Sequence, residues 1–286
     1  MNLNRNRPDI SVVIFTCNSE QFVREAIESI LTQTLQPCEI LICDDHSLDS
    51  TWDIILSYAE RHPALIRPVR HQRNLGQAAN GDFGKQNASG KWIAWIDGDD
   101  RWKPRKLELE WLALQKNPQA KFASSNVQVI NEQGRGIEEW KAGNGINTVS
   151  GNIFLQVFAK RFFQGNNRSI FRNYLVDKQA LTEIGWNDPN LECFWDWDEK
   201  IRLSYKYPAA FTGETLVEYR LHQTNFAARE HHKHLNAMIC VYEKNLPLLA
   251  NRTPLEIAYI RCNVEMSIAE KQRKIAPQYH HPEYTW

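Results

Sequence analysis

Lys91–Asp100, with the sequence KWIAWIDGDD, ends a short apolar segment in three carboxylates. The apolar part, Trp92–Ile96, does not alternate with polar residues and lies between two glycines, which predicts a strand buried on both faces. Carboxylates this close together repel one another unless a positive charge lies between them. Oxygen ligands of this kind suit a hard divalent cation, Mg²⁺ or Mn²⁺, which in turn suits a diphosphate. The same residues also form ordinary solvated turns, so the rest of the chain must decide.

The composition fits one large globular domain, or one domain with an appendage, in a chain of 286 residues. Lysine plus arginine and aspartate plus glutamate both number 34, so the net charge of +0 does not indicate a nucleic acid as the main partner. No segment approaches the ~18 apolar residues of a membrane span, and the polar start does not resemble a signal peptide. The six cysteines form no CxxC pair, which indicates reduced thiols in a cytoplasmic protein.

Strands and helices alternate along the first hundred residues. Uninterrupted apolar runs predict four strands: Ser11–Phe15, Glu39–Cys43, Leu65–Val69 and Trp92–Ile96. Between them, apolar residues at helical spacing predict helices. We expect Asn18 or Ser19 to cap the first helix, and Ser50–Asp53 to form a capping box for the second. The alternation implies parallel strands with helices on both faces of an α/β sheet.

Polar residues follow three of these strands directly. They are Thr16 and Asn18, then Asp44 and Asp45, then Asp97 and Asp99. Because ligands of such sheets bind beyond the carboxyl ends of the strands, we expect these clusters to converge on one crevice.

The second half of the chain is less regular. We predict a strand over Phe122–Ile130, a loop over Glu132–Gly151, a short helix over Asn152–Lys160, a helix over Trp195–Tyr205 and a strand over Thr215–Arg220. Two further helices are predicted at Arg229–Leu249 and Pro254–Arg273. We therefore divide the chain into a domain of residues 1–228 and a C-terminal helical extension of residues 229–286.

Six motifs, in order over about residues 9 to 226, resemble the inverting family-2 nucleotide-sugar glycosyltransferases with the GT-A fold. They are the opening SVVIFTCNSEQFVREAIESILTQTL, then EILICDDHSLDST, then Asn74-Leu75-Gly76 with Gly84, Ala88 and Gly90, then the DxD-like Asp97-Gly98-Asp99-Asp100, then Phe194–Asp198 with Arg202, and finally Tyr219–His222 with Asn225. The resemblance implies a Rossmann-like, mixed but mostly parallel sheet flanked by helices. It also implies transfer of a sugar from a nucleotide diphosphate sugar with inversion.

The resemblance assigns the cation, Mn²⁺ or Mg²⁺, first to Asp99, by its match to the last carboxylate of the DxD motif. Asp97 would contact the ribose, a metal-bound water or the metal itself. His222 would ligate the cation or donate to the diphosphate, and the rival interpretation is a buried structural histidine. Asp100 would support the other two carboxylates.

The nucleotide is assigned to residues after the first two strands and in the glycine-rich segment. Asp45 resembles the carboxylate that accepts from a uracil N–H or a ribose hydroxyl, and Asp44 is its alternative. Thr16 and Asn18 would flank it, with helix capping as the other interpretation of Asn18. The remaining candidates for nucleotide-sugar binding are Asn74, Gly76 and Arg220, where Arg220 either pairs with phosphate or holds its loop.

Asp196 is the candidate general base. The family usually has Glu-Asp here, whereas this chain has Trp195-Asp196, and we expect the indole either to raise the pKa of Asp196 by desolvation or to pack on the acceptor sugar. Asp198 is the alternative base, or else part of an exposed acidic helix start. Arg202 is predicted to pair with a nearby carboxylate.

Two further stretches qualify the resemblance. Asn80-Gly81-Asp82 stands where the family often has Ala-Arg-Asn, so the chain lacks an arginine that would grip the diphosphate. His231 and His234 are one helical turn apart, but no cysteine or carboxylate joins them at metal-site spacing, which favours a solvated helix face.

The leading hypothesis is a cation-dependent inverting glycosyltransferase of polysaccharide or cell-surface glycan synthesis. Its donor would be a UDP-sugar, although dTDP shares the same base edge and GDP stays open, and its acceptor a glycan or a lipid-linked glycan. We expect a cytoplasmic location, with peripheral contact at the inner face of the membrane and a homodimer as open possibilities. The alternatives are a non-catalytic nucleotide-sugar-binding module and a sugar nucleotidyltransferase. The latter needs a basic glycine-rich loop, which Phe15–Ser19 does not provide.

Overall fold

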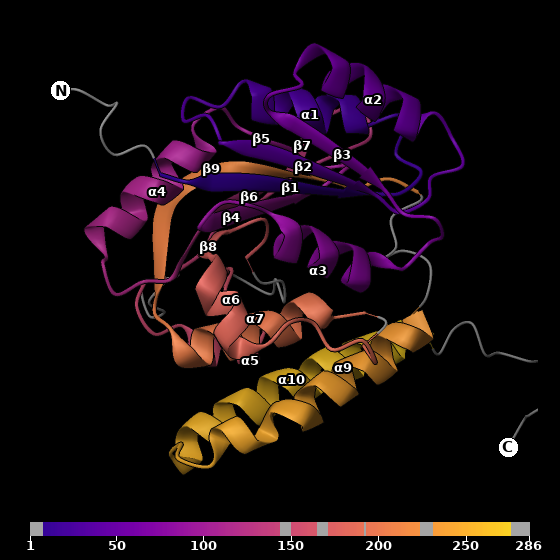
Figure 1. Cartoon of the computed structure of the whole chain (residues 1–286). Helices are drawn as coiled ribbons and strands as arrows, with labels where there is room; N and C mark the ends of the chain where they lie inside the picture. Colours follow the sequence, from indigo (N-terminus) through magenta and orange to yellow (C-terminus); the bar gives the residue numbers. More distant parts are fainter. Residues whose placement is uncertain (1–7, 144–149, 165–170, 192, 224–230, 276–286) are drawn as a thin grey trace, which may run out of the picture.

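The computed structural model describes residues 8–143, 150–164, 171–191, 193–223 and 231–275. Within them, one mixed sheet of nine strands runs through the middle of the molecule (Figure 1). The strand order is β3-β2-β1-β4-β8-β6-β9-β5, and β7 pairs with β6 outside this path. The predicted α/β architecture with helices on both faces is confirmed.

The first half of the sheet is the parallel part. It consists of β1 (Ile10–Thr16), β2 (Glu39–Asp44), β3 (Ile66–Arg70) and β4 (Trp92–Asp97). All seven residues of β1 are buried, as expected for a β-branched and aromatic run covered on both faces. The four strands predicted from the apolar runs are confirmed to within one residue at nearly every end.

Helices α1 (Val23–Leu31) and α2 (Thr51–Arg61) cover one face of this half, and α3 (Gln77–Asn87) covers the other (Figure 1). The predicted cap of α1 is wrong, because Phe22 is its N-cap. Ser50 is the N-cap of α2 as expected, but it makes no side-chain capping bond, so the predicted capping box is not formed. Asp49 accepts instead from the backbone N–H groups of Thr51 (3.0 Å) and Glu20 (3.2 Å).

The second half adds antiparallel strands and further helices. In order they are β5 (Arg101–Trp102), α4 (Lys106–Lys116), β6 (Phe122–Ile130), β7 (Gly136–Trp140), α5 (Phe154–Phe158), β8 (Leu175–Asp177), α6 (Lys178–Ile184), α7 (Trp195–Lys206) and β9 (Ala209–Arg220). The predicted loop after β6 is partly wrong, since β7 pairs antiparallel with β6 inside it. β9 begins six residues before its predicted start and pairs in parallel with β6.

The C-terminal part consists of α9 (His231–Asn245), the 3-10 turn η2 (Leu246–Leu249) and α10 (Pro254–Ile275). α9 and α10 lie side by side, and they contact α7 and α5 respectively on the side of the molecule opposite α1 and α2 (Figure 1). The division at residue 228 stays a prediction, because it falls outside the described residues. None of the described helices is both long enough and apolar enough to cross a membrane.

Close packing of α3 on the sheet gives a direct test of this arrangement. A Cβ on Gly84 would lie well inside van der Waals distance of Val13 Cγ1 and 3.1 Å from Cys43 Sγ, whereas one on Gly81 would meet only ordinary contacts of 3.7–3.8 Å. We predict that Gly84→Ala lowers the free energy of unfolding by about 1–2 kcal/mol, because overpacking outweighs the gain in helix propensity. Gly81→Ala is the matched control and should leave stability unchanged or slightly higher. Urea denaturation of both variants is the measurement, and equal stability would contradict the packing.

Candidate active site

The carboxyl ends of β1, β2 and β4 meet at one edge of the sheet. In the parallel registers Thr16 lies opposite Asp44, and Phe15 lies opposite Asp97. Asp45 and the Asp97–Asp100 turn follow these strand ends directly. The acidic residues at the ends of β2 and β4 therefore lie along a single edge of the sheet. This is the edge where α/β sheets bind their ligands.

Asp97 is half-buried and ion-paired. Its Oδ2 lies 3.3 Å from Arg172 Nη2. Burial raises the pKa of Asp97 to about 6, and the charges of Asp99 and Asp196 act in the same direction, while Arg172 opposes them. The ring of Trp195 lies 6.3 Å from that of Trp95, centroid to centroid, so the start of α7, which carries Asp196, lies near the end of β4, which carries Asp97.

Asp99 and His222 form a pair that fits a divalent cation. Asp99 Oδ2 lies 2.9 Å from His222 Nε2. This is a hydrogen bond between the two side chains, and carboxylate and imidazole are both ligand types that Mn²⁺ accepts. Among the described residues no three His, Cys, Asp or Glu side chains form a complete metal cluster. This pair would thus leave most coordination positions to other oxygens, such as those of a diphosphate and water.

Asp100 and Arg220 close the turn. Asp100 is fully buried and accepts from the backbone N–H of Arg220 (3.0 Å) and from Asn173 Nδ2 (3.1 Å). Burial, with the charge of Asp99, raises the pKa of Asp100 well above its usual range. The guanidinium of Arg220 is also buried, and it donates to Glu25 (2.6 Å) and to the Asp99 carbonyl (2.9 Å). Arg220 was predicted either to pair with phosphate or to hold its loop. These contacts fit the second role.

Arg172 is a residue that sequence reasoning missed. Its guanidinium lies 3.9 Å above the ring centroid of Tyr219, and it is the cation between Asp97 and Asp100. Its side chain keeps 26% of its surface exposed, unlike that of Arg220. Arg172 lies in no motif of the sequence. The one sequence signal for it was the absence, near Asn80, of the arginine that would grip the diphosphate, which meant that another residue had to supply a cation.

The Asp45 carboxylate shapes the glycine-rich loop. Its two oxygens accept from the backbone N–H groups of Leu75 (2.7 Å) and Gly76 (2.9 Å). Asn74 Nδ2 donates to the Asp45 carbonyl (3.1 Å), and Gly76 has a φ of 88°, which glycine tolerates best. The predicted group of Asp45, Asn74 and Gly76 therefore forms one structural unit at the edge of the sheet.

The other nucleotide candidates have different surroundings. Asp44 is fully buried, where it accepts from the backbone of Ser47 and faces Arg70 at 3.4 Å. Asn18 Oδ1 accepts from the backbone N–H of Leu48 (2.8 Å), so it braces a loop and does not cap α1. The Thr16 hydroxyl is buried and has no hydrogen-bond partner among the described residues. It packs against Gly98, whose missing Cβ leaves it room.

Asp196 lies in the first turn of α7 and faces three cations. Lys200 Nζ is 2.8 Å from its Oδ2. Burial pushes the pKa of Asp196 upward, but the positive charges of Lys200, Arg172 and Lys160 outweigh burial and lower it to about 2. The predicted upward shift is wrong, because the fold brings Arg172 and Lys160 close to Asp196 in addition to Lys200, which follows it by one helical turn. Asp196 is therefore ionised at neutral pH.

Trp195 does not lie on an acceptor surface. Only 7% of it is exposed, and its ring packs against Trp95 at a centroid distance of 6.3 Å. Lys85 Nζ lies 5.5 Å from the same ring and is ion-paired with Glu199 (2.5 Å). Trp195 is thus a core residue with little surface left for an acceptor sugar, and the desolvation expected at Asp196 is outweighed by the nearby cations.

The sequence profile described as "Glycosyl transferase family 2" matches residues 11–175, which is more than half of the chain. The chain belongs to glycosyl transferase family 2. An uncharacterized glycosyltransferase of Haemophilus influenzae is 29% identical to this family-2 chain over 265 residues, or 89% of this chain and 78% of the relative. An uncharacterized protein of Mycobacterium tuberculosis H37Rv is 31% identical over 215 residues, which is 74% of this chain. The aligned part covers only 59% of that mycobacterial relative.

Solved structures of low sequence identity share the fold. S. aureus TarS in complex with UDP-GlcNAc superposes with a TM-score of 0.70 over 96% of this chain and 77% of TarS, at 14% identity. The mannosyltransferase PcManGT from Pyrobaculum calidifontis, in complex with GDP-Man and Mn²⁺, superposes with a TM-score of 0.63 over 97% of this chain and 78% of that protein, at 16% identity. The predicted GT-A fold is confirmed.

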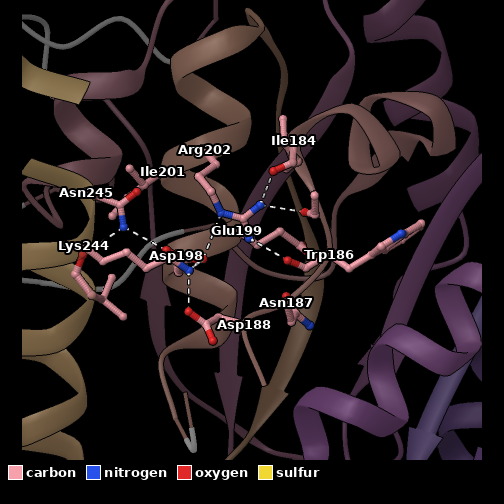
Figure 2. Close-up of polar contacts among 12 residues, drawn as sticks. Ile184, Trp186, Asn187, Asp188, Asp198, Glu199, Ile201, Arg202, Lys244 and Asn245 are labelled. Atoms are coloured by element: carbon pink, nitrogen blue, oxygen red, sulfur yellow. Dashed lines mark hydrogen bonds and ion pairs between the residues drawn. The ribbon is translucent and has the colours of Figure 1, made fainter. Parts of the chain in front are cut away.

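Asp198 links the family-2 fold to the C-terminal helices. It is fully buried, its Oδ2 accepts from Arg202 Nε (2.9 Å) and Lys244 Nζ (3.1 Å), and its Oδ1 accepts from Asn245 Nδ2 (2.8 Å) (Figure 2). Arg202 also donates to carbonyls at the end of α6. An exposed acidic helix start is therefore wrong for Asp198, and the structural role predicted for Arg202 is confirmed.

His234 is also buried, with 5% of its surface exposed and its ring 5.7 Å from that of Phe194. The predicted solvated face is wrong at this position, because α9 packs this side of the helix onto the start of α7. The side chains of His231 to Lys233 lie outside the described residues.

We predict that Asp198→Ala lowers the free energy of unfolding by about 3–5 kcal/mol, because it leaves two cations without their buried carboxylate. Asp188→Ala is the matched control. Asp188 also pairs with Lys244 (2.9 Å), but it lies at the surface, so its loss should cost about 1 kcal/mol or less. Denaturant titration of both variants is the measurement, and equal losses would contradict the assignment of Asp198 as the anchor.

Proposed function

We propose that this family-2 chain transfers a sugar from a UDP-sugar to a hydroxyl of a glycan or lipid-linked acceptor, with inversion and with help from a divalent cation. The observation that carries the proposal is the ionised Asp196 beside the Asp97–Asp100 turn. A carboxylate that is held ionised next to the expected diphosphate edge can accept a proton there. The TarS and PcManGT structures support a nucleotide-sugar donor, because each contains one.

In the proposed reaction the acceptor oxygen attacks the anomeric carbon from the face opposite the diphosphate. The bond between that carbon and the diphosphate oxygen breaks, UDP leaves with the electron pair, and the hydroxyl proton passes to Asp196. A carboxylate with a pKa near 2 is a weak base. It suffices because the transition state is oxocarbenium-like, and the attacking oxygen becomes positive and its proton strongly acidic as the new bond forms.

The remaining residues hold the donor. Asp99 and His222 would hold Mn²⁺ or Mg²⁺, which supplies Lewis-acid stabilisation of the diphosphate charge when bound. Arg172 is the partly exposed cation that faces the same edge, and it takes the place that the missing arginine near Asn80 left open. Asp45, Asn74 and Gly76 form the loop at the nucleotide end, with the unpaired Thr16 hydroxyl beside it.

The role of Asp196 is tested by Asp196→Asn. We predict a loss of sugar transfer of at least about a hundredfold with UDP-sugar affinity within a few fold of wild type, because the amide cannot accept the proton but keeps the shape. Asp53→Asn, the same change on the exposed side of α2, is the control and should leave turnover intact. Because the pKa of Asp196 is about 2, the wild type should show no acid limb from this group above about pH 4. Undiminished transfer by Asp196→Asn would refute the assignment.

The cation and the choice between enzyme and binding module are tested together. Hydrolysis or transfer should occur with a UDP-sugar and Mn²⁺ and stop with EDTA, whereas a non-catalytic module binds the nucleotide sugar without turnover. Comparing UDP-sugars with dTDP- and GDP-sugars identifies the nucleotide base of the donor.

We predict that His222→Gln raises the Mn²⁺ concentration needed for half-maximal turnover by about tenfold, since an amide is a poorer ligand than imidazole. Electron paramagnetic resonance of Mn²⁺ with UDP and each variant gives the same comparison without activity.

A further inference from the structure

A buried lysine lies beside Asp196, and beyond its part in lowering the pKa of Asp196 the proposed reaction assigns it no contact. Lys160 follows α5, and only 8% of its surface is exposed. Its Nζ lies 4.5 Å from the ring centroid of Phe194 and 4.8 Å from that of Trp197. Among the described residues, no carboxylate or other acceptor forms an ion pair or hydrogen bond with this ammonium group. Burial of a cation without such a partner is costly, so the site favours an anion from outside.

Two ring contacts place Lys160 next to Asp196. Its Nζ lies 4.5 Å from the ring centroid of Phe194 and 4.8 Å from that of Trp197, and these two residues flank Asp196 at the start of α7. Burial lowers the pKa of Lys160 to about 8, and the charge of Asp196 opposes this shift. Arg172, in contrast, contacts Asp97 in the turn where the donor diphosphate is expected.

The backbone at this place is strained. Lys160 has a φ of 52° and Phe194 a φ of 58°, a left-handed conformation that costs about 1–3 kcal/mol for a residue other than glycine. The two strained residues touch each other, and Phe194 lies two residues before Asp196. Strain of this kind persists only where the surroundings impose it, and it concentrates at functional sites.

The C-terminal helices bring a second cation to the same ring. Lys271 of α10 places its Nζ 5.4 Å from the ring centroid of Phe194. The buried Asp198 contacts in Figure 2 hold α9 against α7, and α10 packs along α9. The ammonium groups of Lys160 and Lys271, from distant parts of the chain, thus both lie over the ring of Phe194.

We propose that Lys160, flanked by Lys271, forms an anion subsite that binds a phosphate or carboxylate group of the acceptor. This inference rests on the proposed function and narrows its acceptor to an anionic glycan or phosphorylated carrier. An anion seated on Lys160 would place a neighbouring hydroxyl of the same molecule beside Asp196. Because only 8% of Lys160 is exposed, a charge-assisted contact with it is stronger than one with a lysine at the surface.

The test is calorimetric titration of inorganic phosphate, and separately of acetate, into the full chain saturated with UDP and Mg²⁺, so that the donor phosphate positions are filled. Lys160→Met keeps the apolar stem between the two rings and removes the charge, whereas Lys160→Arg keeps the charge. We expect at least one anion to bind the wild type and Lys160→Arg, and to bind Lys160→Met at least tenfold more weakly. Lys116→Met, the same change at an exposed lysine at the end of α4, is the control and should bind as wild type.

Binding of phosphate alone indicates a phosphorylated acceptor, and binding of acetate indicates a uronic or other carboxylated one. The subsite is refuted if neither anion binds the wild type, or if Lys160→Met binds them equally well. A fall in melting temperature of Lys160→Met with unchanged anion binding would likewise assign Lys160 a purely structural role. Donor hydrolysis by the wild type tests the proposed function separately, because it needs no acceptor.

Discussion

Four carboxylates gather at one edge of the sheet, and the cations placed between them make this burial possible. Asp97, Asp99, Asp100 and Asp196 come from two distant segments, and Arg172 and Lys200 lie among them. Without these cations, burial and mutual repulsion would neutralise the carboxylates one by one. The cations offset burial and repulsion to different extents at the two sites, so the pKa of Asp97 is about 6 and that of Asp196 is about 2. Neighbouring carboxylates thereby acquire different properties within one site.

The sequence predicted β1 to β4 and β6 well and missed β7, for a physical reason. β1 and β4 are covered on both faces, so their apolar runs are unambiguous. β7 is almost entirely exposed and carries Glu138 and Glu139, so its composition is that of a loop. It exists because β6 offers it hydrogen bonds, which is a property of the partner and not of the segment itself.

The acidic members of the candidate site could be named from motifs, but their partners could not. Lys200 sits one helical turn after Asp196 and could have been paired with it by spacing alone. Arg172 lies in no motif and Lys160 ends a short predicted helix, and only the fold brings these two residues close to α7. The direction of the Asp196 pKa shift depends on Arg172 and Lys160 as well as on Lys200, so it could not be derived from the sequence.

Asp196 and Asp198 occupy the same turn of α7, yet one is the candidate base and the other fastens α9. Any displacement of the C-terminal helices therefore also displaces the first turn of α7, which carries Asp196. A chain truncated before α9 would keep every motif residue and still be inactive. The contacts of Asp198 with Lys244 and Asn245 therefore couple the position of the C-terminal helices to that of Asp196.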